Sequence, residues 1–323
     1  MDKKEARIMF MGTPEFAVAS LDILVKNGYN IVGVVTAPDR RAGRGRKMSF
    51  SPVKKYALEK GLRILQPEKL RDEAFVKELT YLKPDLQIVV AFRMLPEVVW
   101  SLSGLGTFNL HASLLPQYRG AAPINWAVIN GEKETGVTAF FIDEKIDTGK
   151  VIMWEKTKIG DEETAGELHD RLMQMGAGLV LQTVNKIIKG DYTLIDQKDI
   201  EVNIDVLRPA PKIFKEDCRI DWNCDIISIH NLIRGLSPYP GAFTEFISPD
   251  GDNYFVKIYK ATKIEDRPAK SQLLETDGKT FIRISGNDGY INILDIQVAG
   301  KKRMMTDELL RGFHLNNGWK IKG

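Results

Sequence analysis

Short apolar runs and segments with helical periodicity alternate through the first 190 residues of the chain. Runs of four to eight apolar residues predict strands, and apolar positions that recur every three to four residues predict helices between them. Residues 85–92 are almost continuously apolar, as expected of a parallel strand covered on both faces. The alternation predicts an α/β domain of the Rossmann-like, doubly wound kind with a mostly parallel sheet. The predicted strands are 7–11, 31–36, 85–92, 106–110, 137–142 and 151–158, and the predicted helices are 15–27, 51–61, 123–130 and 164–189.

The pattern changes after Gly190. Residues 191–211 are polar and without a sustained period, and they end in Arg208-Pro209-Ala210-Pro211, which is typical of a linker. A helix over 225–234 and several short strands follow, with hairpin signals at Asp250-Gly251 and Asp288-Gly289. These features predict a small β-barrel of the oligonucleotide-binding kind. The predicted strands are 242–247, 254–259, 280–285 and 290–297, and the predicted division is an α/β domain over 1–190, a linker over 191–211 and a barrel domain over 212–323.

Composition narrows the class of protein. The chain has 323 residues, 43% of them hydrophobic, and a formal net charge of +3, so two domains with sizeable cores are expected and a globally basic nucleic-acid binder is not. No apolar run is long enough for a membrane span, and the first residues lack the apolar core of a signal peptide. The two cysteines, Cys218 and Cys224, make neither a disulfide framework nor a four-ligand zinc site. We therefore expect a cytoplasmic protein with reduced thiols and no membrane association, and no obligate protein partner is evident.

The glycine motifs of nucleotide-binding enzymes are missing. After the first predicted strand the chain reads Gly12-Thr13-Pro14-Glu15-Phe16, in place of the G-x-G-x-x-G that cradles a pyrophosphate. Gly43-Arg44-Gly45 lacks the third glycine and the strand–turn–helix context, and no P-loop occurs. A nicotinamide dehydrogenase is therefore disfavoured.

An amide and an imidazole lie two residues apart where a predicted strand ends, at Asn109 and His111. Residues i and i+2 of an extended chain point to the same side, so both groups are aimed into one space. That pair suits acyl transfer, in which a donor holds the developing oxyanion and a titratable ring moves protons. Either residue alone would be interpreted as structural; their shared direction and the loop over 113–123 favour the catalytic interpretation.

Asp147-Thr148-Gly149 lies in the connection over 143–150 between two apolar strands. These residue types also make ordinary hairpin turns. The connection is long for a tight hairpin, and long connections in compact domains are more often functional. A carboxylate beside His111 would fix the tautomer of the ring and favour its charged form.

Two clusters of positive charge stand out against the near-neutral total. The segment over 39–47 places its basic residues around two glycines, and either a solvated flexible loop or a mobile arm that contacts phosphates fits this composition. A second cluster in the barrel domain is either a charged turn or a further RNA contact. The basic residues are Arg40, Arg41, Arg44, Arg46 and Lys47 in the first cluster, and Lys301, Lys302 and Arg303 in the second.

The motifs taken together resemble the folate-dependent formyltransferases over essentially the whole chain. The matching stretches are Met11-Gly12-Thr13-Pro14-Glu15-Phe16-Ala17, Pro38-Asp39-Arg40, Ala42-Gly43-Arg44-Gly45, Ser51-Pro52-Val53-Lys54, Asn109 to Pro116, Arg119-Gly120-Ala121-Ala122-Pro123-Ile124, Glu134-Thr135-Gly136-Val137-Thr138, Asp147-Thr148-Gly149, Ile220-Asp221-Trp222 and Ala299-Gly300-Lys301-Lys302.

The resemblance implies 10-formyltetrahydrofolate as the co-substrate and formyl donor, with no metal. Asn109, His111 and Asp147 would be the catalytic residues, a set that specifies the chemistry and leaves the acceptor open. The basic loop and the barrel narrow the acceptor to the methionine α-amino group of initiator Met-tRNA. Alternative readings are a formyltransferase for a nucleotide or sugar amine, which shares the same core, and a non-enzymatic RNA-binding protein, which leaves the amide, imidazole and carboxylate without a role.

The same resemblance implies the substrate contacts. Ala91-Phe92-Arg93-Met94 leads directly into Leu95-Pro96, where the family often has Ala-Tyr-Gly and a slightly longer stretch, and this segment resembles the wall against which the folate ring lies. The expected folate-binding residues are Phe92, Met94, Leu95, Ser113, Leu114, Leu115, Pro116, Ile142 and Asp143. The expected tRNA-binding residues are Arg40, Arg41, Arg44, Arg46, Lys47, Lys301, Lys302 and Arg303.

Overall fold

The structure is a computed structural model that describes residues 2, 4–42, 47–200, 207–266, 268, 270 and 272–322, without the side chains of 41, 42 and 47. The chain folds into two compact units, and the chain passes between them several times. Unit 1 comprises Met1–Gly120, Thr135–Thr157 and His169–Pro209, and unit 2 comprises Ala121–Glu134, Lys158–Leu168 and Ala210–Gly323.

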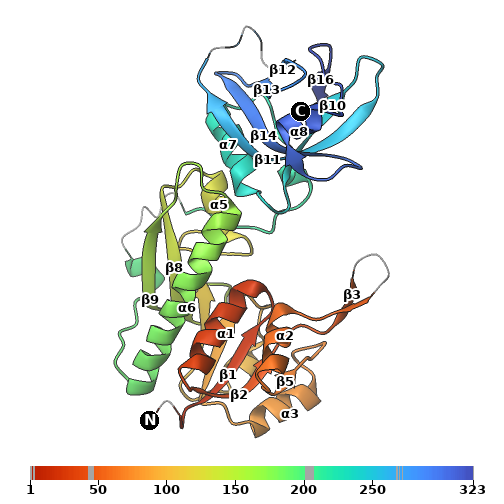
Figure 1. Ribbon diagram of the computed structural model, residues 1–323. Helices are drawn as coiled ribbons and strands as arrows, with labels where there is room; N and C mark the ends of the chain where they lie inside the picture. The colour runs from red at the N-terminus through yellow and green to blue at the C-terminus, as the bar shows by residue number, and fades with distance from the viewer. Residues whose placement is uncertain are drawn as a thin grey trace. The chain divides into compact units, whose positions relative to one another are not determined.

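A seven-stranded sheet forms the centre of unit 1, in the order β5-β2-β1-β6-β7-β8-β9 (Figure 1). The first five strands in this order run parallel, and β8 runs antiparallel to β7. The predicted Rossmann-like, mostly parallel sheet is therefore confirmed. The strands are β1 (Arg7–Gly12), β2 (Asn30–Val35), β5 (Ile64–Leu65), β6 (Leu86–Val90), β7 (Thr107–His111), β8 (Glu134–Phe141) and β9 (Val151–Lys158).

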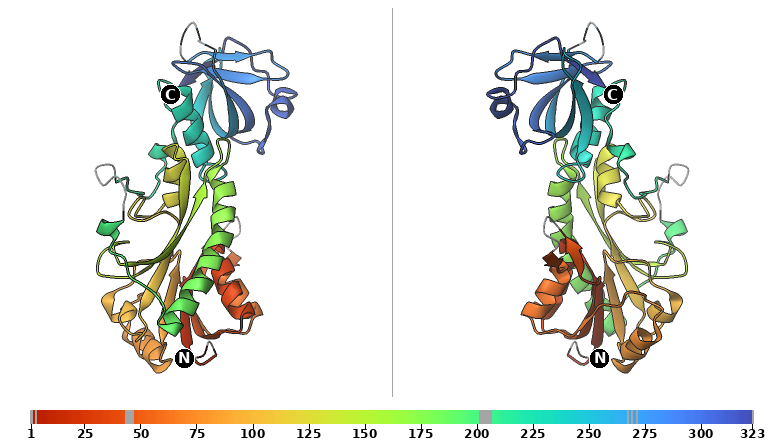
Figure 2. Two further views of the ribbon diagram at one scale, coloured as in Figure 1. Left: turned by 90° about the vertical axis from the view of Figure 1, so that its left-hand side faces the viewer. Right: turned by 90° about the vertical axis from the view of Figure 1, so that its right-hand side faces the viewer.

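Helices cover both faces of this sheet, with α1 and α6 on one side and α3 and α4 on the other (Figure 2). Gly176 of α6 lies directly over Leu110, where a Cβ would come within 2.7 Å of the leucine side chain. On the opposite face, Phe75 and Leu79 of α3 share an apolar cluster with Met11. The helices are α1 (Glu15–Lys26), α2 (Pro52–Glu59), α3 (Glu73–Tyr81), α4 (Glu97–Trp100) and α6 (Ala165–Lys189).

Residues on both sides of 43–46 form paired strands, whereas the charges of the segment over 39–47 suggested a flexible loop or a mobile arm. β3 (Arg40–Ala42) and β4 (Lys47–Ser49) pair as an antiparallel ribbon, with Arg40 opposite Ser49. Such a ribbon is held by backbone hydrogen bonds and needs no apolar side chains. The pattern of hydrophobic residues therefore did not predict it. Arg44 and Arg46 lie outside the described residues.

Unit 2 is built around an antiparallel sheet in the order β12-β13-β14-β11-β10-β16, with β15 paired to β14. A bridge between Leu273 and Lys320 joins the two ends of this order, so the sheet is nearly closed. The predicted β-barrel and its two hairpin turns are confirmed. The strands are β10 (Ala242–Ile247), β11 (Asn253–Ile264), β12 (Leu274–Thr276), β13 (Ile282–Ser285), β14 (Tyr290–Val298), β15 (Met304–Met305) and β16 (Lys320–Lys322).

Helices pack beside the barrel within the same unit. Asn125 donates a hydrogen bond to the carbonyl of Gly235 at 2.7 Å, and a Cβ on Gly235 would collide with Ile129, so α5 and α7 approach closely. Inside the barrel Trp222 is fully buried, and its indole N–H donates to Thr244 Oγ1 at 3.0 Å. The helices are α5 (Pro123–Ile129), α7 (Ile226–Gly235) and α8 (Thr306–Leu310).

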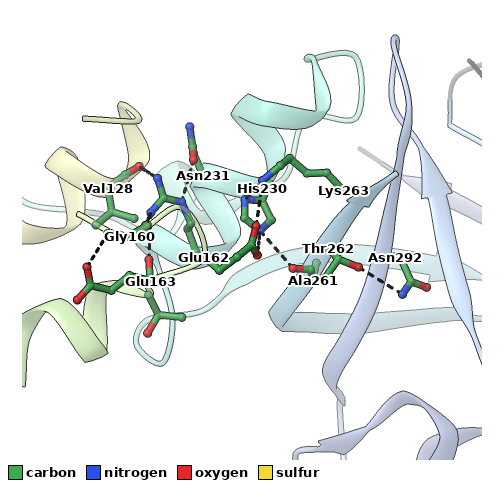
Figure 3. Close-up of polar contacts among 12 residues, drawn as sticks. Val128, Gly160, Glu162, Glu163, His230, Asn231, Ala261, Thr262, Lys263 and Asn292 are labelled. Atoms are coloured by element: carbon green, nitrogen blue, oxygen red, sulfur yellow. Dashed lines mark hydrogen bonds and ion pairs between the residues drawn. The ribbon is translucent and has the colours of Figure 1, made fainter. Parts of the chain in front are cut away.

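A polar cluster ties the loop over 160–163 to α7 and β11 in unit 2 (Figure 3). The buried guanidinium of Arg234 donates to the carbonyls of Gly160 and Glu163 at 3.2 and 3.0 Å. Buried His230 lies between the Glu162 carboxylate, 3.0 Å from Nε2, and the Lys263 ammonium, 3.1 Å from Nδ1. The loop is therefore held by the buried Arg234 guanidinium and by the hydrogen bonds of the buried His230 ring.

None of the described helices is long and apolar enough to cross a membrane.

Candidate active site

Asn109 and His111 lie on one face of β7, as strand alternation predicts. The residues between and beside them, Phe108 and Leu110, are buried on the face that α6 covers. β7 pairs with β6 on one side and with β8 on the other, which places Asn109 between Val89 and Phe140. The central position of β7 in the sheet therefore fixes the direction of both polar side chains.

The carboxamide of Asn109 is available to a ligand. The side chain is half-buried, and no other described residue is hydrogen-bonded to its amide. A carboxamide offers two N–H donors. The site therefore presents a fixed, unused donor beside the imidazole.

His111 is 6% exposed, and its Nε2 lies 2.8 Å from the carbonyl oxygen of Tyr118. A carbonyl only accepts, so Nε2 carries the proton and Nδ1 of the neutral ring has a free lone pair. Nδ1 lies 3.8 Å from Asp147 Oδ2, beyond hydrogen-bonding range. The tautomer is therefore set by the Tyr118 carbonyl and not, as the sequence predicted, by Asp147.

Asp147 reaches His111 because the connection over 143–150 folds back across the sheet. β8 ends at Phe141, opposite Phe108 near the beginning of β7, so the chain must return toward the other end of β7. The Asp147 backbone is left-handed, with φ of 54°, and Oδ2 accepts a hydrogen bond from Gly120 N at 3.0 Å. The segment is thus a loop that folds back toward β7, and the hydrogen bond from Gly120 fixes the position of the Asp147 carboxylate.

Gly149 is required where this loop re-enters the sheet. A Cβ at that position would lie 1.7 Å from the carbonyl oxygen of Phe141. No side chain fits there without moving backbone. The glycine of Asp147-Thr148-Gly149 therefore lets the loop return beside β8.

Asp143 and Ile142, two of the expected folate-binding residues, have internal partners. The Asp143 carboxylate accepts from Lys145 N at 3.0 Å and from Thr148 Oγ1 at 2.8 Å, which closes the loop on itself. Ile142 donates its N–H to Thr107 O at 2.8 Å, and its half-buried side chain packs against the cluster of Met11.

The stretch from Ser113 to Pro116 turns most of its side chains inward. The Ser113 hydroxyl is fully buried and donates to Gln117 O, and Leu115 packs with Phe140. Thr138 Oγ1 donates to Ser113 O and accepts from Leu115 N. Leu114 remains half-buried and Pro116 is buried, so this stretch offers a ligand mainly its backbone.

The segment over 91–95 presents apolar side chains beside a firmly held backbone. Phe92 is half-buried against the cluster of Met11, Met94 is 70% exposed, and Leu95 is buried. The Arg93 guanidinium donates to the carbonyls of Glu68, at 2.7 Å, and of Pro67. Phe92 and Met94 therefore have free apolar surface.

The basic residues are divided between the units. Arg40, Arg41 and Lys47 belong to the ribbon in unit 1, while Lys301 and Lys302 are exposed in unit 2.

Arg303 of the same cluster has partners within the fold. Its Nη2 lies 2.6 Å from Asp295 Oδ2, and the guanidinium lies 4.2 Å above the Tyr259 ring. The hydrogen bonds to Asp295 raise the pKa of Arg303 above its usual value. Its outer edge alone is available to a phosphate.

Three contributors to this site escaped the sequence analysis. Tyr118 and Gly120 act through backbone atoms, which leave no residue-type signal. Gln197 belongs to a segment interpreted as linker, yet its side chain is bonded to the Asp147 loop. Among the described residues, no group of three or more histidine, cysteine or carboxylate side chains could hold a metal ion.

Comparison with known proteins identifies the family. The profile of the formyl transferase family matches residues 6–184, and that of the formyl transferase C-terminal domain matches 212–314. Methionyl-tRNA formyltransferase of Bacteroides thetaiotaomicron is 56% identical over 322 residues, covering 99% of this chain and 100% of the relative. That of Parabacteroides distasonis is 54% identical over 318 residues, covering 97% of each chain.

Solved structures share the fold at low identity. An N-formyltransferase from Helicobacter canadensis, in complex with folinic acid and dTDP-3-aminofucose, gives a TM-score of 0.66 at 23% identity over 91% of this chain and 98% of its own. HypX from Aquifex aeolicus, in complex with tetrahydrofolic acid, gives 0.62 at 19% identity over 94% of this chain and 46% of its own. The matched domains and the relatives above half identity show that the chain belongs to the formyl transferase family, among the methionyl-tRNA formyltransferases.

Proposed function

We propose that this protein transfers the formyl group of 10-formyltetrahydrofolate to the α-amino group of methionine on initiator Met-tRNA. The relatives above half identity over their full length support this acceptor. The observation that carries the chemistry is the polar trio of Asn109, His111 and Asp147: an unused amide donor, an imidazole with a free Nδ1, and a carboxylate 3.8 Å from that nitrogen. Such a reaction belongs in the cytoplasm, where charged tRNA meets the ribosome.

The amine attacks the formyl carbon, and a C–N bond forms as the carbonyl oxygen becomes an oxyanion. The Asn109 amide donates a hydrogen bond to that oxygen, a contact worth about 100- to 1000-fold in rate in comparable sites. Because the strand on which Asn109 lies is paired on both sides, the donor is in place before charge develops.

The proton released by the amine goes to His111 Nδ1, since the Tyr118 carbonyl occupies the other ring nitrogen. The Asp147 carboxylate then faces the imidazolium as its counter-ion. When the bond from the formyl carbon to N10 of the folate breaks, the same proton passes to N10, so the imidazole ends neutral. General acid–base help of this kind is worth about 100- to 10,000-fold.

The flat folate ring would lie on the free apolar surface of Phe92 and Met94, with half-buried Ile142 packed against the same cluster as Phe92. We assign Leu95, Ser113, Leu115 and Pro116 to supporting that surface and to offering backbone groups, since these side chains are buried. Leu114 remains a candidate for direct contact. Asp143 would act by closing the loop that covers the ring.

The tRNA would be held by its phosphates. We propose that the basic residues of the segment over 39–47, which are Arg40, Arg41, Arg44, Arg46 and Lys47, bind near the acceptor end. Lys301, Lys302 and the outer edge of Arg303 would contact the rest of that arm. The corresponding functional domains are a catalytic domain over 1–190, a linker over 191–211 and a tRNA-binding barrel over 212–323.

The test is formyl transfer from 10-formyltetrahydrofolate to charged initiator tRNA by Asn109→Ala, His111→Ala and Asp147→Ala variants. Each should keep its fold and lose at least about 100-fold in kcat. Arg44→Ala should raise KM for tRNA and leave folate affinity unchanged. Near-normal turnover by all three folded alanine variants would remove the assignment of the polar trio.

A formyltransferase that acts on a nucleotide or sugar amine is the second candidate. The dTDP-sugar complex of the Helicobacter canadensis relative supports it, although at 23% identity that likeness is one of fold. Offering dTDP-amino sugars and charged tRNA in parallel separates the two. Transfer to the sugar alone would overturn our choice of acceptor.

A further inference from the structure

The side chain of Gln197 lies in the interior of unit 1, with 4% of its surface exposed. It belongs to a 3-10 turn, Gln197–Asp199, that follows α6 and a bridge between Ile195 and Val151. A buried carboxamide is costly unless its polar atoms find partners. Its contacts therefore indicate what the turn is for.

All four hydrogen-bonding positions of this carboxamide are used. Nε2 donates to Asp147 O at 2.9 Å and to Gly149 O at 2.8 Å. Oε1 accepts from Arg119 Nε at 3.0 Å and from Arg119 Nη2 at 2.6 Å. An amide has two donors and two acceptor lone pairs, so Gln197 is fully satisfied by these two segments.

The two segments are those that hold the reacting pair. Arg119 lies between Tyr118, whose carbonyl binds His111, and Gly120, whose N–H binds Asp147. On the other side, the amide spans the carbonyls on either side of Thr148. One side chain thus fixes the distance between the His111 support and the Asp147 loop.

The Asp147 loop needs such a support. Asp147 has φ of 54°, a left-handed conformation that a residue with a side chain rarely adopts and that persists where surrounding contacts hold it. Its carboxylate oxygen lies 3.8 Å from His111 Nδ1, so no direct hydrogen bond locks the pair. The position of the carboxylate depends on what holds its backbone.

We propose that Gln197 is a positioning residue for formyl transfer, which keeps the Asp147 carboxylate in register with His111 by clamping both of their backbone segments. The inference rests on the proposed function, in which Asp147 stabilises the protonated imidazole. Gln197 itself touches no substrate. It works through Asp147, so its effect must vanish when the carboxylate is absent.

The experiment is a double-mutant cycle. Gln197→Met keeps the length of the side chain and removes all four hydrogen bonds, and Asp147→Asn removes the negative charge. With wild-type Asp147, Gln197→Met should lower kcat by about 10- to 100-fold and change the KM values for folate and tRNA by less than about 3-fold. In the Asp147→Asn background the same change should cost less than about 3-fold.

Gln87→Met is the matched control. Gln87 is fully buried in the same unit and donates to Val99 O and Thr107 Oγ1, while its Oε1 has no partner among the described residues, so its loss should lower Tm by less than the loss of Gln197. Its effect on kcat should combine additively with Asp147→Asn. Should Gln197→Met not fold, Arg119→Met releases the clamp from the other side and must show the same dependence on Asp147.

Equal losses from Gln197→Met in both backgrounds would mean a merely structural residue and would overturn the inference. Unchanged kcat in a folded Gln197→Met variant would do the same. Normal turnover by Asp147→Asn would overturn the proposed role of Asp147 instead, which keeps the two failures distinguishable.

Discussion

Single residues near the candidate site depart from ordinary backbone preference. Ala91, Tyr118 and Asp147 have φ of 46°, 58° and 54°, values that residues with a side chain rarely adopt. Asp147 belongs to the polar trio, Tyr118 binds His111 through its carbonyl, and Ala91 begins the segment of Phe92 and Met94, whereas Lys83 and Gln272 adopt the same conformation elsewhere. Local rules are most often broken at functional sites, where surrounding contacts compensate for the strain. The Asp147 loop therefore owes its shape to particular contacts.

Gly149→Ala should show how little room this loop has. The new Cβ would lie 1.7 Å from Phe141 O, so backbone must move at a cost of about 1–3 kcal/mol. We expect a lower Tm and, because Asp147 moves with the loop, a lower kcat. Differential scanning calorimetry and a formylation assay measure the two effects.

Gly178→Ala in α6 is the control, since a Cβ there meets nothing within 4 Å. Alanine in a helix interior should raise stability by about 0.5–1 kcal/mol and leave kcat unchanged. Equal behaviour of the two variants would contradict the role given to Gly149.

The sequence predicts those site residues whose side chains carry the chemistry. Asn109 and His111 were aligned by strand alternation alone, and the length of the 143–150 connection pointed to Asp147. The partners of these groups could not be found that way. Gly120 contributes a peptide N–H, and Gln197 comes from a stretch without periodicity.

At the scale of elements, length decided what the sequence could predict. Most long strands and α6 were placed within a few residues of their ends, whereas β11, predicted over 254–259, runs from Asn253 to Ile264. β5 has two residues and α4 has four, too few for a period to show. α3 was not predicted although its nine residues carry a helical signal: Asp72 caps the helix, and Phe75 and Leu79 lie four apart on its buried side.

The polar cluster around His230 in unit 2 should make the stability of the protein depend on pH. Lys263 donates to His230 Nδ1, so the ring is neutral and its Nε2–H points at Glu162 and the carbonyl of Ala261. Burial lowers the pKa of His230, Lys263 and Arg234 lower it further, and Glu162 opposes them. The folded state therefore binds the proton less readily than the unfolded chain.

Stability from this cluster is fully present above the unfolded pKa of about 6.5 and is lost as the pH falls below it. The free energy of unfolding, measured with urea at pH 7.5 and 5.5, should fall by at most about 1.4 kcal/mol per pH unit from this group. His230→Gln should flatten that dependence, while His314→Gln at an exposed position should not. If the free energy of unfolding of His230→Gln depends on pH as steeply as that of the wild type, the polar cluster is not the cause of this dependence.

Over the whole chain the net charge is small, and the positive charge that could bind a polyanion is gathered in two local clusters. A net charge of +3 over 323 residues gives little long-range attraction, so binding of a polyanion rests on local clusters. Composition excluded a globally basic protein without locating those clusters. Their positions came from the sequence, and the ribbon pairing of the first came from the structure.

Salt dependence tests the second cluster. KM for tRNA should rise steeply with KCl, because each phosphate contact releases counter-ions. Lys301→Gln with Lys302→Gln should raise KM at low salt, leave kcat unchanged and reduce the slope of log KM against log salt by about 1 per lost contact. Replacing Lys26 and Lys77, exposed lysines outside both clusters, should leave the slope as it is. If the slope of log KM against log salt stays the same in the Lys301/Lys302 variant, these lysines form a charged turn and do not contact the tRNA.

The carbonyl of Tyr118 has a consequence for how such an enzyme can be mapped by mutagenesis. A substitution at position 118 changes the side chain but keeps a backbone carbonyl there, so mutagenesis cannot delete the acceptor of His111 itself. Chemical synthesis can change it: an ester in place of the amide between 118 and 119 would weaken that oxygen as an acceptor. One of the groups that orient the His111 imidazole is thus a backbone atom, and only a change to the backbone can test its role.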